Sequence, residues 1–238
     1  MNSASKTPQP APDSWRSLPR GPYIAEQLQQ RLDEWAPGLF GFSLLKVDAL
    51  SAELSLERSR LRQGVVMAQR ERDGMDLLGD ATAMPFAPGS LDACLLAHVL
   101  DYSEHPHAIL RETEVVLRDD GWLVLTGFNP YGSAGLARCW PGWRQRLPNW
   151  RHMLAPARVE DWLKLLGFEV IERDYIGFTG FMPWLDRWQR RCCPAVLPSP
   201  AAVYILLARK RRFPLTPVRE RKPVAAPVAR PEMARQRE

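Results

Sequence analysis

Short apolar segments alternate with amphipathic segments along most of the chain, and this alternation constrains the fold more than any other feature. Residues 93–97, Ala-Cys-Leu-Leu-Ala, are continuously apolar, which is typical of a parallel strand covered on both faces. Other segments are shorter or alternate between apolar and polar residues. We predict strands over residues 42–48, 65–69, 76–79, 93–97, 122–126, 168–174 and 202–208.

Three intervening segments have the apolar spacing of helices that bury one side. The first predicted helix covers residues 23–35, and Pro37 with the following glycine ends its apolar pattern. Pro106 suits the first turn of a second helix, and residues 159–166 form a third that stops at Gly167.

Two weaker local signals concern helix ends. Ser51 is placed to cap a helix that runs through Leu54 and Leu61. Gly121 is placed to end the helix that begins at Pro106.

Strands that alternate with helices predict an α/β fold, with an open, mostly parallel sheet and helices on both faces. In such sheets ligands bind beyond the carboxyl ends of the strands. The residues that directly follow each predicted strand are therefore the candidates for a functional site.

Composition divides the chain into three parts. Residues 1–20 are polar and Pro-rich, which predicts a disordered lead, and residues 213–238 predict a disordered basic tail. Residues 21–212 form the predicted domain. Residues 209–238 hold ten Lys or Arg and three Glu, whereas the other 208 residues hold 22 basic and 24 acidic ones. The tail is thus compatible with a nucleic-acid partner or an anionic lipid, and a solvated extension is the alternative.

Neither a membrane span nor a secretory leader is predicted. No apolar run reaches the roughly 20 residues that a span needs, and residues 1–12 lack an apolar signal region. The four cysteines include no Cys-x-x-Cys pair. We therefore expect reduced thiols and a cytoplasmic protein.

Residues 79–123 contain several short motifs in a fixed order. The motifs are Gly79-Asp80-Ala81, Met84-Pro85-Phe86, Ser90-Leu91-Asp92, Val116-Leu117 and Gly121-Trp122-Leu123. In this order they resemble the second half of class I S-adenosylmethionine-dependent methyltransferases, especially those of the ubiquinone-biosynthesis type. The chain resembles still more closely a small group of bacterial methyltransferase-domain proteins.

The resemblance implies a seven-stranded Rossmann-like methyltransferase fold with an antiparallel last strand, and S-adenosylmethionine as cofactor. Asp80, with Ala81 beside it, would lie near the adenine amine. His98 would lie near the methionine part of the cofactor, and a half-buried histidine with its own hydrogen bonds is the alternative. The implied reaction transfers a methyl group to a small-molecule acceptor, for which an apolar compound is one candidate.

The chain departs from this family at the first strand. No glycine occurs between Gly41 and Gly64, although the family has a Gly-x-Gly loop where the backbone approaches the cofactor closely. Asp48 and Ser51 stand in that place. Asp48 is the candidate for a cofactor contact there.

The second departure is at the second strand. Glu71, or alternatively Asp73, is the candidate for the acid that holds the ribose hydroxyls in the family. Asp80 follows so soon that no helix fits between the second and third strands. The predicted cofactor half is therefore abbreviated. The missing glycine loop favours one alternative function, a methyltransferase-like binding or regulatory module without catalysis.

Other signals leave alternatives open. Residues 138–151 and 178–191 interleave Trp or Phe with Arg, which suits a lid over an apolar substrate, nucleic-acid stacking, a membrane interface or simple packing. An RNA-binding protein is a third and weaker hypothesis. His105 and His107 flank a proline without further ligands at metal-site spacing, so we predict a helix start and no metal.

Overall fold

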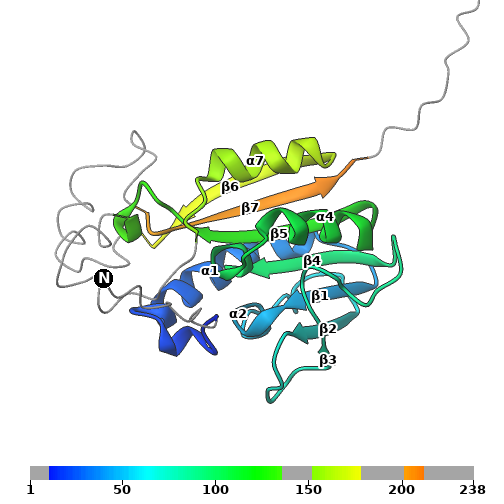
Figure 1. Cartoon of the computed structure of the whole chain (residues 1–238), viewed down its shortest axis with the longest axis horizontal. Coiled ribbons are helices and arrows are strands. Elements are labelled where there is room, and N and C mark those ends of the chain that lie inside the picture. Colours follow the sequence, from blue (N-terminus) through cyan, green and yellow to red (C-terminus); the bar gives the residue numbers. More distant parts are fainter. Residues whose placement is uncertain (1–10, 136–151, 178–200, 212–238) are drawn as a thin grey trace, which may run out of the picture.

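The computed structural model describes residues 11–135, 152–177 and 201–211. Their strands form one seven-stranded sheet in the order β3-β2-β1-β4-β5-β7-β6 (Figure 1). Neighbouring strands are parallel except where β7 pairs with β5 and β6, which confirms the predicted sheet. The strands are β1 (Ser43–Val47), β2 (Gln63–Ala68), β3 (Leu77–Leu78), β4 (Leu91–Ala97), β5 (Leu117–Phe128), β6 (Phe168–Ile176) and β7 (Val203–Lys210).

Helices cover both faces of the sheet, so β4 is buried along its whole length. Ala93 and Leu95 enter an apolar cluster with the buried side of α1. Cys94 and Leu96 point the other way, into a cluster with α4 and α7. The helices are α1 (Gly21–Trp35), α2 (Asp48–Ala52), α3 (Val99–Tyr102), α4 (Pro106–Val116) and α7 (Pro156–Leu165), with short 3₁₀ helices η1 (Trp15–Ser17) and η2 (Ala36–Gly38).

The three strongest helix predictions are confirmed. α1 passes directly into η2, which contains the predicted Pro37 stop. α4 begins at Pro106. α7 ends two residues before Gly167, whose φ of 81° lies in the left-handed region that a glycine adopts readily.

The helix predicted around Ser51 is wrong in its length and in its cap. α2 ends at Ala52 and does not continue to Leu61, and Ser51 lies inside it. The buried Ser51 hydroxyl accepts a hydrogen bond from the Ala97 backbone N–H at 2.8 Å. The local cap pattern failed because this hydroxyl makes a long-range contact to β4 instead.

The predicted glycine end of α4 is also wrong. α4 ends at Val116 and β5 begins at Leu117, so Gly121 already belongs to the strand. The buried Lys210 ammonium of β7 donates to the Leu117 carbonyl oxygen at 2.8 Å and pairs with the Glu114 carboxylate at 2.9 Å. A lysine can satisfy carbonyl groups at a helix end, so this end needs no glycine cap.

The packed structure begins before the predicted boundary at residue 21. Trp15 and Leu18 are buried, and the Trp15 Nε1–H donates to the Leu50 carbonyl oxygen at 2.9 Å. The predicted disorder is therefore wrong for this part of the lead. Residues 1–10 and 212–238 lie outside the described residues, so the rest of the lead and the tail stay predictions.

The sheet edge at β3 is reduced, as predicted. β3 has two residues, and residues 69–76 join β2 to it without a helix. A parallel crossover usually needs a dozen or more residues, so these eight residues leave no room for one.

The segments rich in Trp and Arg, 138–151 and 178–191, lie outside the described residues. Their role as a lid, an interface or simple packing therefore stays a prediction. Among the described residues, no helix is both long enough and apolar enough to span a membrane.

Candidate functional site

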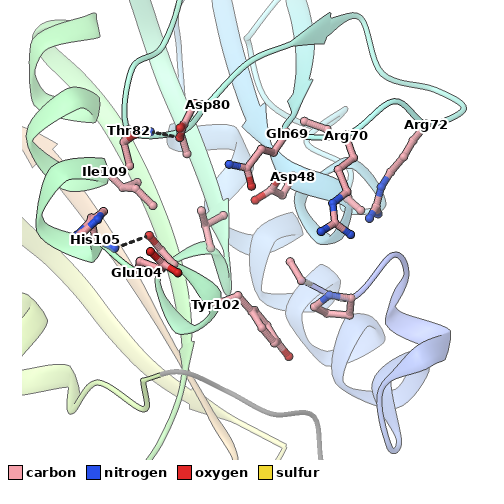
Figure 2. Close-up of a pocket in the computed structure, with 17 residues that line it drawn as sticks. Asp48, Gln69, Arg70, Arg72, Asp80, Thr82, Tyr102, Glu104, His105 and Ile109 are labelled. Atoms are coloured by element: carbon pink, nitrogen blue, oxygen red, sulfur yellow. Dashed lines mark hydrogen bonds between the residues drawn. The ribbon is translucent and has the colours of Figure 1, made fainter. Parts of the chain in front are cut away.

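A cavity of about 320 Å³ lies at the carboxyl ends of the parallel strands (Figure 2). This size falls within the range of about 300–1,000 Å³ that is usual for small-molecule sites. The segments that follow β1, β2, β3 and β4 all reach it. Its polar and charged side chains belong to Asp48, Gln69, Arg70, Arg72, Asp80, Thr82, Tyr102, Ser103, Glu104 and His105.

Asp48 directly follows β1 and lines this cavity, in the place of the implied glycine loop. Its φ of 64° is in the left-handed region, which aspartate tolerates better than most residues. Burial raises the pKa of the Asp48 carboxyl, and a hydrogen bond from the Gln69 backbone N–H partly opposes that rise. The charge of Asp80 raises this pKa further, whereas Arg70 lowers it. A cationic ligand group would therefore stabilise the ionised Asp48.

Side-chain hydrogen bonds hold in place the segment that follows β1, residues 48–54, which we call the β1 turn. Trp15 donates to Leu50, as described above, and Ser51 accepts from β4. The Lys46 ammonium donates to the Leu54 carbonyl oxygen at 2.7 Å, and burial lowers the pKa of Lys46. The turn is thus fixed by side chains where the family uses glycines.

Asp80 and Ala81 follow β3 and line the cavity. Asp80 lies on the opposite side from Arg70 and Arg72 (Figure 2). The Asp80 carboxylate accepts a hydrogen bond from the Thr82 backbone N–H at 2.8 Å. This bond orients the carboxylate and leaves its other oxygen available, so Asp80 can accept from a ligand.

The structure does not bring Glu71 to the same cavity. Glu71 and Asp73 line a neighbouring cavity of about 460 Å³. Gln69 and Arg70 are the first residues after β2, and both reach the main cavity. Arg70 and Arg72 line both cavities and therefore lie between them.

His98 is completely buried at the end of β4 and does not line the cavity. Its Nδ1 is 2.9 Å from Asp101 Oδ2, which also accepts the Phe128 backbone N–H at 3.0 Å. Burial raises the pKa of Asp101, and the hydrogen bond to His98 opposes that rise. The ring of Trp15 meets His98 edge-on, with 5.3 Å between the ring centroids.

The buried histidine therefore stabilises the turn between β4 and α3, where His98 itself has a φ of 58°. The residues that follow it, Val99 and Tyr102, are the ones that line the cavity. This arrangement is closer to the alternative given for His98 from the sequence, although His98 is fully buried and not half-buried. Its Nε2 has no hydrogen-bond partner among the described residues.

Sequence reasoning missed Gln69, Arg70, Arg72, Tyr102 and Glu104 as lining residues. The signal that could have found them is position, because all five lie within a few residues of the carboxyl end of β2 or β4. Within the described ranges, no group of His, Cys, Asp or Glu is arranged to hold a metal ion.

Residues 38–125 match the family described as a methyltransferase domain. The uncharacterised protein YafS of Escherichia coli K12 is 37% identical over 206 residues, which cover 87% of this chain and 84% of YafS. Solved structures with the same fold include two from other bacteria. A putative S-adenosylmethionine-dependent methyltransferase of Listeria monocytogenes has a TM-score of 0.56 at 11% identity and covers 79% of this chain and 98% of its own.

The second structure is an S-adenosylmethionine-dependent methyltransferase of Mesorhizobium loti, with a TM-score of 0.53 at 13% identity, covering 76% of this chain and 96% of its own. At these identities the two structures show the fold alone, whereas YafS and the matched domain show the family. The ubiquinone-biosynthesis subtype stays a prediction. The chain belongs to the methyltransferase-domain family together with YafS, and it has the fold of class I S-adenosylmethionine-dependent methyltransferases.

Proposed function

We propose that this protein binds S-adenosylmethionine in the cavity at the carboxyl edge and transfers its methyl group to a small-molecule acceptor. The observation that carries the proposal is the meeting of Asp48, Asp80 and Ala81 in one cavity beyond β1, β3 and β4. Ligands of open α/β sheets bind at this edge.

The residues present fit such a cofactor in size and charge. The cavity is large enough for a nucleoside-sized ligand. The partly buried Asp48 carboxylate suits an ammonium group, because a nearby positive charge offsets its loss of hydration. Asp80 can accept a hydrogen bond from the adenine amine. When bound, S-adenosylmethionine supplies a methyl group activated by its sulfonium charge.

The protein's own contribution is positioning and exclusion of water. The side-chain bonds that hold the β1 turn fix Asp48 before a ligand arrives. We assign no general base. His98, which is buried against Asp101, does not line the cavity.

Calorimetric titration of the full chain with S-adenosylmethionine and S-adenosylhomocysteine tests the proposal. We expect micromolar dissociation constants. The Asp80→Ala variant should bind S-adenosylhomocysteine about two- to tenfold more weakly, because one hydrogen bond contributes roughly 0.5–1.5 kcal/mol.

Asp119→Ala is the matched control, because Asp119 is exposed near the opposite end of the sheet, at the start of β5. It should leave the dissociation constant unchanged. Absence of binding to the folded wild-type protein, or equal losses in both variants, would contradict the proposed cofactor site.

A further inference from the structure

The wall of the cavity that follows β2 is basic. Arg70 and Arg72 both line it, and Figure 2 shows both side chains on the same side of the cavity. Glu71, between them in sequence, lines only the neighbouring cavity. The side of the main cavity that follows β2 therefore offers two guanidinium groups and no carboxylate from the 69–72 segment.

Arg72 has an unused donor at this wall. Its Nη2 forms an ion pair with Asp13, whereas its Nη1 is buried and has no acceptor among the described residues. A buried donor without an acceptor is costly. The Asp13 side chain is 76% exposed, and exposed ion pairs contribute little to stability. An anion at Arg72 could therefore replace Asp13 at small cost.

Arg70 is exposed and forms no ion pair with any described residue. It acts electrostatically on Asp48, whose pKa it lowers. Asp48 lines the main cavity together with this arginine pair, and Asp80 lies across it. The neighbouring cavity, which both arginines also line, holds the carboxylates of Asp13, Glu53, Glu71 and Asp73.

The chemistry of this wall determines which ribose substituent it can hold. In doubly wound sheets, an acid after the second strand accepts hydrogen bonds from the ribose hydroxyls, whereas an arginine there accommodates a ribose phosphate. Arginine only donates hydrogen bonds, and its planar fork matches phosphate oxygens.

We infer that the arginine pair, Arg70 and Arg72, binds a phosphate group on the 2′ or 3′ position of an adenine nucleotide's ribose. The inference rests on the proposed function only in placing an adenosine group in this cavity. It adds a second ligand class, the ribose-phosphorylated adenine nucleotides, which would compete with S-adenosylmethionine.

Titration of the full chain with isomeric nucleotides tests this inference. The probes are adenosine 2′-, 3′- and 5′-monophosphate, which carry the same charge at different positions, and adenosine without phosphate. We expect the 2′ or 3′ isomer to bind about ten- to a hundredfold more tightly than the 5′ isomer and adenosine, because this is the affinity that charge-assisted hydrogen bonds typically contribute. Equal affinity for the three isomers would overturn the inference.

Variants locate the effect at the wall. Arg70→Gln and Arg72→Gln should each reduce the preference for the 2′ or 3′ isomer about tenfold, and a preference retained in both variants refutes the assignment. Arg62→Gln is the matched control, because Arg62 is an exposed arginine just before the opposite end of β2. It should keep the full preference.

Asp13→Asn removes the competing carboxylate and should tighten binding of the preferred isomer severalfold. Because misfolding would weaken binding, this gain separates a site effect from a loss of structure. Unchanged or weaker binding in this variant counts against the arginine pair. S-adenosylhomocysteine is titrated into the same samples. If S-adenosylhomocysteine binds while the isomers do not differ, the phosphate site fails and the proposed function stands. If the isomers differ while S-adenosylhomocysteine does not bind, the phosphate site stands and the proposed function fails.

Discussion

Asp92 shows how one side chain can fix the start of two strands. Its Oδ2 accepts the backbone N–H groups of Phe42 and Ser43 at 2.8 and 2.9 Å, and its Oδ1 pairs with Arg118 at 2.8 Å. These contacts give Asp92 a structural role at the opening of β4. Burial alone would raise the pKa of Asp92, but the Ser43 and Phe42 donors and Arg118 lower it below its usual value.

The lowered pKa leads to a prediction about Asp92→Asn. At pH 7 this variant should lose about 1–3 kcal/mol of unfolding free energy, because an amide replaces a buried acceptor of charge-assisted bonds. A depressed folded-state pKa stabilises the protein above the unfolded value of about 3.9. That stabilisation is lost as the pH falls through the folded-state pKa.

Urea unfolding of Asp92→Asn and the wild type between pH 7 and pH 3 measures this difference. The gap between the two proteins should shrink below about pH 4. A gap that is constant with pH would mean that the ionised carboxylate contributes nothing specific.

At the scale of elements, β4 is the strand on which both layers of helices depend. Its alternating side chains enter the two separate apolar clusters, so truncation of one of them leaves a cavity that neighbours on one face cannot easily fill. Leu95 is fully buried, whereas Leu165 in α7 is 86% exposed. The pair offers the same substitution in opposite environments.

Leu95→Ala should lower the free energy of unfolding by about 2–5 kcal/mol, as buried leucines do. Leu165→Ala should change it by less than about 0.5 kcal/mol. Denaturant unfolding of the two variants measures the difference. Similar values for both would show that β4 is not the centre of the core.

At the scale of the whole molecule, the segment before α1 ties the sheet to the site. Trp15 contacts His98 through its ring and Leu50 through its Nε1–H. It thereby joins the turns after β1 and β4, and Ala11 and Pro12 continue into the wall of the cavity. Residues 11–18 therefore belong to the folded domain, where they pack against the turns after β1 and β4 and line the cavity.

Trp15→Ala should destabilise the protein by about 3–5 kcal/mol and lower the Tm by roughly 10 °C. Deletion of residues 214–238 should leave the Tm nearly unchanged, because its composition predicts few buried contacts. Calorimetric melting of both forms measures these effects. A Tm unaffected by Trp15→Ala would mean that the segment does not support the fold.

Local sequence patterns were enough to predict most of the sheet and its long helices. The continuous apolar segment at 93–97 and the alternating one at 168–174 predicted β4 and β6, because side-chain periodicity reflects which faces are buried. The motifs in residues 79–123 further indicated the family and the antiparallel last strand. These signals are local patterns or short motifs in a fixed order along the chain, so they need no knowledge of distant contacts.

The helix ends and the composition of the site depend on contacts between residues that are far apart in the chain. Ser51 and Lys210 bond to groups more than 40 residues away, and such contacts leave no local pattern. In the same way, Asp48 and Asp80 reach the cavity whereas Glu71 and His98 do not. The direction of a side chain after a strand depends on the φ and ψ angles of the turn, and packing against distant segments such as Trp15 sets those angles.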